Sequence, residues 1–238
     1  MPIDVPKDTW PGEVRSVTLG ASADQGGSRV RAVTVGGEKT LPFMHFEAEM
    51  PNAPVIAVEI KDRRPDDWSP LLLEAWGEAA DDPAAWAKAA QDTGCDLIQL
   101  SFSLTDASGE TTTAESAVST VKAVLQASGL PLLVFGPGQA ELDNELLVAV
   151  AEATKGERLV LGLCEDKNYR TIVATAMAND HLVVARSPMD VNLAKQLNIL
   201  LGNLGVQKEK ILIDPTTGGL GYGLEYSYSV MERIRMAA

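Results

Sequence analysis

The sequence predicts an α/β protein: a (β/α)8 barrel of the TIM type with six of its eight strand–helix units present, preceded by an N-terminal β-hairpin. Short apolar segments alternate with helical patterns at roughly 30-residue spacing, which is typical of strands connected by helices. The strand segments are apolar almost throughout, as in parallel sheets covered on both faces. No GxGxxG motif follows the first of them, which disfavours a doubly wound nucleotide-binding sheet.

The N-terminal part of the chain has the pattern of a β-hairpin. Residues 13–20 and 29–36 alternate apolar and polar side chains and are rich in β-branched residues, with a polar, glycine-bearing stretch between them. A linker containing prolines follows at 41–54. We therefore expect two parts, an N-terminal hairpin and linker over 1–52 and an incomplete barrel over 53–238.

The six strand–helix units follow in order. Strands are expected at 55–60, 96–102, 130–135, 158–163, 181–185 and 210–213. Helices are expected from Leu71, again from Asp82-Pro83 to about Thr93, and over 113–127, 140–154, 168–179, 189–204 and Glu225 to the end. Because a complete barrel has eight units, we expect the sequence to be a fragment that lacks roughly 60–80 residues.

Composition excludes several classes of function. The net charge of −13, from 33 acidic and 20 basic residues, opposes binding to nucleic-acid phosphates, and no basic patch compensates for it. Cys95 and Cys164 lie far apart without CxxC spacing, which indicates small buried thiols and no iron–sulfur or metal site. There is no secretion signal and no apolar run of the roughly 18 residues that a membrane helix needs, so a cytoplasmic protein is expected.

Polar residues follow each predicted strand, where barrels place their sites. They are Glu59, Asp62, Ser101, Ser103, Gly136, Gly138, Glu165, Asp166, Asn168, Arg186, Ser187, Asp190, Asn192, Asp214, Thr216 and Thr217. They include no pair of nucleophile and base, since neither His45 nor His181 follows a strand. We therefore name no catalytic residue.

Several of these residues also have a purely structural interpretation. Asp190 can cap the helix that it opens, and the pair Glu165-Asp166 can be a solvated helix start. The glycines at 136 and 138 can form a tight turn, although free amides at a helix start also form weak anion sites. Asn192 lies within a helical pattern, where Asn is not favoured, which raises the chance of a specific hydrogen bond.

The segment 214–226, DPTTGGLGYGLEY, is the most distinctive of the chain. Its four glycines, among them Gly218, Gly219 and Gly221, allow the backbone to approach another surface closely. Tyr222 and Tyr226 add flat amphipathic faces that are favoured at interfaces. The segment lacks the GK[ST] ending of a phosphate-binding loop. We interpret it as a surface for a ligand or partner, the alternative being a flexible loop.

Two long motifs resemble a known family. The stretches SPMDVNLAKQLNILL (187–201) and DPTTGGLGYGLEYSYSVMERIRMAA (214–238) are similar to the small (delta) subunit of the corrinoid iron–sulfur protein. That protein serves the acetyl-CoA decarbonylase/synthase system of the reductive acetyl-CoA (Wood–Ljungdahl) pathway of carbon fixation. The stretches 35–47, 50–60 and 165–172 fit the same pattern, so the resemblance runs across essentially the whole chain in order.

The resemblance implies a methyl-carrier subunit rather than a catalyst on its own. Such a subunit forms a heterodimer with a larger subunit that carries the iron–sulfur cluster and mainly holds the corrinoid (cobamide). The pair takes a methyl group from a methyltetrahydropterin methyltransferase and passes it to acetyl-CoA synthase, both of which are transient partners. This chain is expected to contribute cobamide contacts through Asn168, Asp190, Asn192, Asp214, Thr217, Gly218, Gly219, Gly221 and Tyr222.

Two alternatives remain open. In the first, the chain is a pterin-binding methyltransferase barrel that acts on a corrinoid protein, with Asp214, Asn168 and Asp190 as hydrogen-bonding partners of the pterin. In the second, it is a structural partner subunit whose rim contacts only protein.

Overall fold

The computed structural model describes residues 3–41 and 44–237, and its centre is one parallel sheet. The six strands run in the order β3-β4-β5-β6-β7-β8, so each strand pairs with its neighbour in the sequence. They are β3 (Ala57–Lys61), β4 (Leu97–Ser101), β5 (Leu132–Phe135), β6 (Val160–Cys164), β7 (Leu182–Arg186) and β8 (Ile211–Asp214). These are six successive strands of a TIM-type barrel, as predicted, with β3 and β8 at the edges of the sheet.

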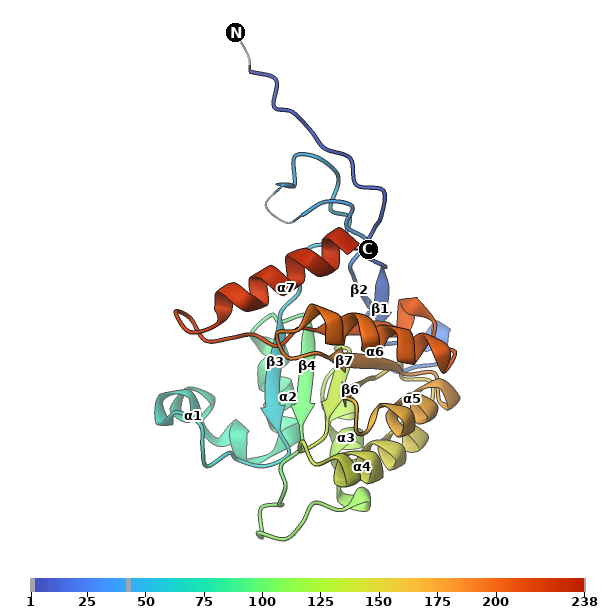
Figure 1. Cartoon of the computed structure of the whole chain (residues 1–238). Helices are drawn as coiled ribbons and strands as arrows, with labels where there is room; N and C mark the ends of the chain where they lie inside the picture. The colour runs from blue at the N-terminus through green and yellow to red at the C-terminus, as the bar shows by residue number, and fades with distance from the viewer. Residues whose placement is uncertain (1–2, 42–43, 238) are drawn as a thin grey trace.

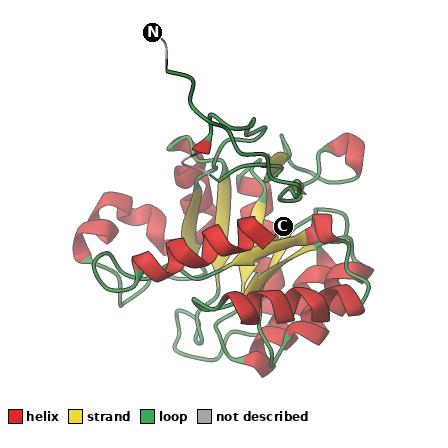
Figure 2. Cartoon of the chain, turned by 45° about the horizontal axis from the view of Figure 1, so that its top comes forward, coloured by secondary structure: helices red, strands yellow, loops and turns green. Residues whose placement is uncertain are grey.

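Helices follow the strands and most of them cover the outer face of the sheet, whereas α7 comes after the last strand and lies apart from the others (Figure 1). They are α1 (Pro70–Trp76), α2 (Pro83–Asp92), α3 (Ala114–Ala127), α4 (Ala140–Ala153), α5 (Tyr169–Ala178), α6 (Val191–Asn203) and α7 (Leu224–Ala237). The strands change direction from one side of the sheet to the other, so the sheet is strongly curved (Figure 2). None of the helices in the described residues has the length and hydropathy needed to span a membrane.

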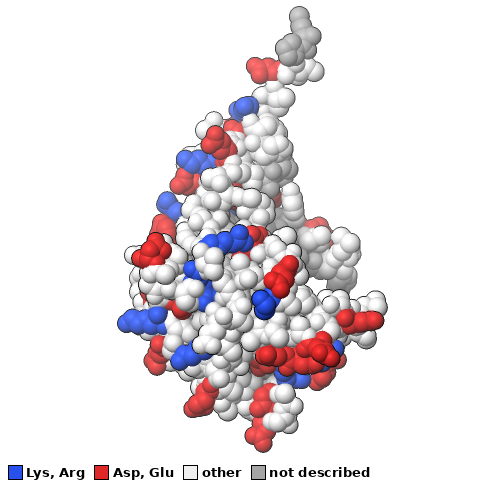
Figure 3. All heavy atoms as spheres, turned by 180° about the vertical axis from the view of Figure 1, so that it is seen from behind, with Lys and Arg blue, Asp and Glu red and all other residues white. Residues whose placement is uncertain are grey.

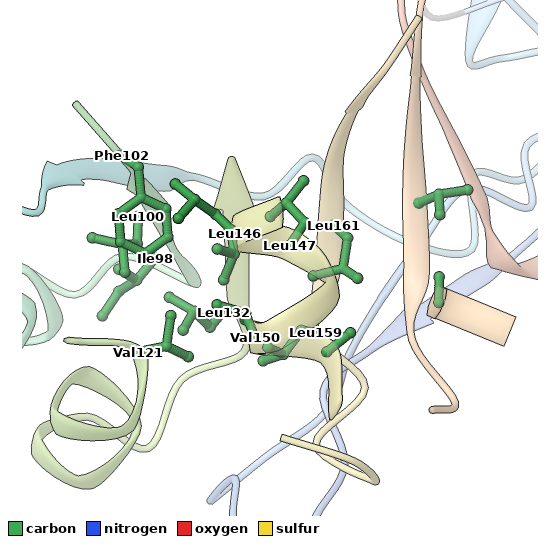
Figure 4. Packing of buried hydrophobic residues seen from close by; sticks show 14 of the residues in the cluster. Ile98, Leu100, Phe102, Val121, Leu132, Leu146, Leu147, Val150, Leu159 and Leu161 are labelled. Atoms are coloured by element: carbon green, nitrogen blue, oxygen red, sulfur yellow. The ribbon is translucent and has the colours of Figure 1, made fainter. Parts of the chain in front are cut away.

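The outer face of the sheet packs against the helices through a continuous apolar core. Leu132 and Leu161 of the sheet meet Leu146, Leu147 and Val150 of α4 in Figure 4. All five side chains are at most 2% exposed, which places this contact among the most completely buried of the chain. Burial of such side chains contributes about 1.5–3 kcal/mol each and holds the helices to the sheet.

The inner face of the sheet is covered at its amino end by the N-terminal strand pair. β1 (Val17–Leu19) and β2 (Val33–Val35) pair antiparallel, which confirms the predicted hairpin. Val17 and Leu19 pack against a second apolar cluster of inward-facing strand residues, Leu97, Leu133, Val160, Leu182 and Val184. The hairpin thus closes the amino end of the barrel interior.

The two hairpin strands have three residues each and are shorter than the predicted 13–20 and 29–36. Before β1 and after β2 the two segments still pair, since the N–H of Val14 donates to the carbonyl of Glu38 (3.0 Å) and that of Gly37 to the carbonyl of Val14 (2.9 Å). On the turn side, backbone groups bond the barrel instead. Gly20 donates its N–H to the carbonyl of Arg158 (3.2 Å), and Val30 donates to that of Gly129 (2.9 Å). Because these backbone groups are already bonded to the barrel, they are not available to extend the hairpin ladder.

Lys and Arg are interspersed with Asp and Glu on the face seen in Figure 3, and Asp and Glu gather at its lower right. This face shows no continuous basic surface of the kind that binds nucleic acid. The net charge of −13 is consistent with that distribution.

Candidate functional site at the carboxyl ends of the strands

A hollow of about 590 Å³ opens on the inner side of the sheet, at the carboxyl ends of the strands. Its lining residues are Glu59, Lys61, Gln99, Ser101, Phe102, Phe135, Gly136, Pro137, Leu163, Arg186, Asp214, Thr216 and Thr217. All six strands or the loops after them contribute, and this is the end at which TIM-type barrels carry their sites.

The alternation of side chains along each strand explains why the hollow is polar. On β4, Leu97 faces inward against the hairpin, so Gln99 and Ser101 lie on the same face further along the strand. On β7, Val184 faces inward and Arg186 follows it two residues later. The interior is therefore apolar near the hairpin and polar at the opposite end.

The hollow carries charges of both signs, and most of them are paired. Lys61 Nζ lies 3.4 Å from Glu59 Oε1, and Gln99 Nε2 donates to Ser101 Oγ at 3.1 Å. Arg186 pairs with Glu165, a neighbour outside the lining, at 3.2 Å. These ion pairs are partly exposed, so each contributes little to stability. The hollow offers hydrogen-bond donors and acceptors together without a strong preference for an anion or a cation.

One wall of the hollow is apolar. Phe102, Phe135, Pro137 and Leu163 line the part formed by β4, β5 and β6. A ligand with one apolar side and several amide or hydroxyl groups matches such a mixed lining.

The segment 214–226 enters this rim directly after β8. Asp214 Oδ1 accepts a hydrogen bond from the N–H of Thr216 at 2.7 Å, which turns the backbone sharply as the strand ends. The N–H of Gly218 donates to Ser227 Oγ at 2.7 Å. A Cβ on Gly218 would lie 2.4 Å from the carbonyl carbon of Gly223, so only glycine permits the two ends of the loop to meet here.

The tip of this loop projects into solvent. The N–H of Tyr222 donates to the carbonyl of Gly219 at 2.9 Å, which makes a tight turn. The side chains of Leu220 and Tyr222 are 91% and 92% exposed. Large apolar side chains held outward on an ordered turn are typical of a surface that another molecule covers.

The other residues nominated from the sequence are placed differently. Asp190 Oδ1 accepts from the N–H groups of Asn192 (2.8 Å) and Leu193 (3.2 Å), which makes it the cap of α6. Asn192 is exposed on the first turn of the same helix. Asn168 is buried behind the rim, where its amide oxygen accepts from the N–H of Glu165 at 2.8 Å.

A buried carboxylate supports the rim from behind. Asp143 of α4 accepts from the N–H of Gly138 at 2.9 Å and from Nδ2 of Asn168 at 3.4 Å. Burial raises the pKa of Asp143, and the hydrogen bonds from Gly138 and Asn168 oppose that rise. A Cβ on Gly136 would lie 2.2 Å from Asp143 Oδ1. The turn at 136–138 is thus occupied by a carboxylate of the chain itself.

Of the nominated residues, the structure places Asp214 and Thr217 in the lining of the hollow, whereas Asn168, Asp190 and Asn192 are not among the lining residues. Gly218, Gly219, Gly221 and Tyr222 follow Thr217 in the loop 217–223, the glycine loop, and do not line the hollow. The sequence reasoning missed Lys61, Gln99 and Phe135. Gln99 lies inside an otherwise apolar strand, two positions before the polar Ser101. This pattern is the sequence feature that could have indicated Gln99 as a site residue. Lys61 is the last residue of β3 and directly precedes the candidate Asp62.

Among the described residues, no group of three or more His, Cys, Asp or Glu side chains could hold a metal ion. Cys95 and Cys164 are both buried and unbonded to each other, as predicted from their spacing.

Comparisons with known proteins identify the family. The family model for the CO dehydrogenase/acetyl-CoA synthase delta subunit matches residues 16–238. Subunit delta of the acetyl-CoA decarbonylase/synthase complex of Archaeoglobus fulgidus is 39% identical over 238 residues, which is 97% of this chain and 52% of that protein. Subunit delta 1 of Methanosarcina thermophila is 38% identical over 232 residues, with 96% and 53% covered.

Two solved structures of dihydropteroate synthase also resemble the chain, although distantly. The enzyme of Anaplasma phagocytophilum has a TM-score of 0.48 at 16% identity, covering 76% of this chain and 73% of that one. The enzyme of Xanthomonas albilineans has a TM-score of 0.49 at 17% identity, covering 77% and 68%. The chain spans about half the length of the curated relatives it matches. The family match and the related delta subunits show that the chain belongs to the CO dehydrogenase/acetyl-CoA synthase delta subunit family.

Proposed function

We propose that the chain serves as the delta-subunit barrel of an acetyl-CoA decarbonylase/synthase system, where it helps to hold a cobamide in a complex with a larger iron–sulfur subunit. In this role the larger subunit carries the iron–sulfur cluster and most of the cobamide contacts. A methyltetrahydropterin methyltransferase and acetyl-CoA synthase bind the pair transiently. We expect the complex to work in the cytoplasm.

The observation that carries the proposal is the glycine loop beside the polar hollow. Leu220 and Tyr222 present apolar surface outward, suited to the face of a large planar ring. The hollow that Asp214, Thr216 and Thr217 line at the start of this segment combines donors and acceptors, which suits the uncharged amide groups around such a ring. The hydrogen bond from the N–H of Gly218 to Ser227 Oγ closes the base of the loop. The side chains of Leu220 and Tyr222 are therefore held in place before a ligand arrives.

The residues of this chain bind and orient in the proposed role. The bound cobamide supplies the methyl-transfer chemistry through its cobalt. In the complex the loop 217–223 would hold the ring and exclude water from it, and Asp214 fixes the direction in which that loop leaves β8. Of the nominated contacts, Asp214 and Thr217 line the hollow, and Gly218, Gly219, Gly221 and Tyr222 belong to the loop that follows them. Asn168, Asp190 and Asn192 act indirectly, through the loops and the helix that they stabilise.

The test uses the complex of this chain with the larger subunit, purified after co-expression. Visible absorption gives the corrinoid content per heterodimer, and size-exclusion chromatography gives the amount of heterodimer. The double variant L220A/Y222A should retain about tenfold less corrinoid at limiting cofactor, because aromatic and apolar anchors dominate such contacts. Val30→Ala is the matched control, since Val30 is also exposed, at 83%, but lies beside Gly129 at the amino end of the barrel.

Unchanged corrinoid content after replacement of residues 216–223 by an unrelated linker would contradict the proposal. Loss of heterodimer together with full corrinoid retention in the remaining complex would favour a purely structural subunit.

The pterin-binding methyltransferase keeps only one of its three nominated residues at the hollow. Asp190 is the cap of α6 and Asn168 is bonded to its own loop, which leaves Asp214. Binding of methyltetrahydrofolate to this chain alone, followed by methyl transfer to free cobalamin, would favour that alternative.

A further inference from the structure

Arg186 lies between two hollows of the rim. It lines the central hollow and also a smaller one of about 210 Å³ between the start of α5 and α6. It is the last residue of β7, on the inward face that it shares with Val184. Its side chain is 35% exposed, so it forms part of a wall rather than a free surface charge.

The two hydrogen bonds of Arg186 go to different loops. Nη1 donates to Glu165 Oε1 at 3.2 Å, in the loop between β6 and α5. Nε donates to Thr216 Oγ1 at 3.3 Å, in the loop after β8. The guanidinium is planar with its donors at fixed directions, so one arginine head relates the positions of these two loops.

Thr216 needs such support because of its backbone. Its φ is +62°, a left-handed conformation that is unfavourable for a β-branched residue. The backbone N–H of Thr216 is held by Asp214 Oδ1 and its hydroxyl by Arg186. This turn sets the direction in which the chain proceeds to Gly218 and the exposed tip.

We infer that Arg186 is a positioning residue, which fixes the exit of the glycine loop 217–223 through Thr216 and couples it to the β6–α5 loop through Glu165. The inference about the loops stands on the contacts of this chain, and only its consequence for cobamide rests on the proposed function. The glycine loop and the β6–α5 loop should both lose order when the guanidinium group is removed, because the one side chain of Arg186 bonds to both.

Hydrogen exchange of the 238-residue chain tests the coupling. Arg186→Lys keeps the charge but replaces the planar guanidinium, whose Nε and Nη1 donate to different loops, by a flexible ammonium group without that fixed geometry. We expect roughly fivefold faster exchange of the amides of Thr216 and Gly218 and of Glu165 and Asn168, the scale of one lost hydrogen bond. Arg158→Lys is the matched control. Its Nε lies 3.3 Å from Asp180 at a similar exposure of 33%, before β6 at the other end of the barrel.

A double-mutant cycle separates positioning from general loosening. Thr216→Val replaces the hydroxyl by a methyl group, so amide exchange should rise in the glycine loop and stay unchanged at 165–168. Thr216→Ser keeps the hydroxyl and should therefore keep the protection of the wild type. In the double variant R186K/T216V, the amides of the glycine loop should exchange no faster than in the single variant with the larger effect. Additive effects, or unchanged exchange of the glycine loop in both single variants, would overturn the inference.

The same variants in the heterodimer distinguish this inference from the proposed function. If exchange changes as expected and corrinoid content does not, the positioning role stands and the cobamide role of the loop fails. If corrinoid content falls in R186K while exchange of the free chain is unchanged, the positioning role fails and the cobamide role stands.

Discussion

Arg29 and Glu157 form an ion pair at the amino end of the barrel, with Arg29 Nε 3.3 Å from Glu157 Oε2. The side chain of Arg29 is 1% exposed and that of Glu157 is 17% exposed. Arg29 lies in the segment that connects β1 and β2, whereas Glu157 lies three residues before β6. The pair therefore fastens the N-terminal segment to the barrel from within.

Replacement of Arg29 by Met should destabilise the chain strongly. The guanidinium also donates to the carbonyl groups of Ser128 (2.6 Å), Leu125 (2.7 Å) and Leu130 (3.2 Å), at the end of α3. Met fills the space but leaves these carbonyls and Glu157 without their partner, so we expect a loss of about 3–5 kcal/mol of unfolding free energy. Urea unfolding followed by circular dichroism measures it.

Arg31→Met provides the comparison for Arg29. Arg31 pairs with Asp96 at a similar distance of 3.2 Å, but its side chain is 52% exposed. The loss there should be about 0–1 kcal/mol. Equal effects of the two substitutions would show that the hairpin is not held by the buried arginine.

His181 should make the stability depend on pH. Its Nδ1 accepts from the N–H of Leu159 at 3.1 Å, so Nε2 carries the proton and donates to the carbonyl of Ala151 at 3.0 Å. Burial lowers the pKa of His181 below its ordinary value of 6.5, and the hydrogen bond to Ala151 opposes this. The unfolded chain therefore binds the proton more readily, and the contribution of His181, fully present above pH 6.5, is lost as pH falls through its folded pKa.

The variant His181→Asn isolates that contribution. An amide oxygen can still accept from Leu159, while the bond to Ala151 is lost, which should cost about 1–2 kcal/mol at pH 8. The difference between wild type and variant should shrink as pH falls below 6.5. His45→Asn, at an exposed residue, should change the unfolding free energy by less than about 0.5 kcal/mol. A difference for His181 that stays constant with pH would contradict the prediction.

The order and direction of the strands could be predicted because they follow from local patterns. Continuous apolar segments such as LPLLVF (130–135), each followed by a helical pattern, leave few arrangements other than sequential parallel strands. The helix restart at Pro83 was also predictable, since Asp82 caps it through the N–H of Ala84.

The long-range partners of polar residues could not be predicted in the same way. Nothing near Arg29 in the sequence indicates that it bonds carbonyl groups about 100 residues later. Asn168 had the composition and position of a rim residue, but its partner Asp143 lies on the preceding helix and draws it behind the rim. Such pairs depend on tertiary packing, which a single sequence does not display.

Both thiols should be unreactive in the folded chain. Burial raises the pKa of Cys164 to about 12, and the side chain is fully buried in the sheet. Burial also raises the pKa of Cys95, which is 5% exposed. Because the thiolate is the reactive form, an aromatic disulfide reagent at pH 8 should modify neither thiol until urea unfolds the chain. The variant Cys95→Ser assigns the signal to Cys164, and rapid reaction of either thiol in the folded state would contradict the burial.

Gly218→Ala should separate the two ends of the glycine loop, which meet at Gly218 and Gly223. The new Cβ would lie 2.4 Å from the carbonyl carbon of Gly223. Because this obstacle is backbone, the two segments of the loop must move apart. We expect chymotrypsin to cleave at Tyr222 at least tenfold faster, while the midpoint of global unfolding changes little, because the loop lies outside the core. Gly219→Ala is the matched control, since its Cβ would find its nearest neighbour, the carbonyl oxygen of Tyr222, at 3.9 Å. Equal cleavage rates for the two variants would show that the close approach of Gly218 and Gly223 does not hold the loop.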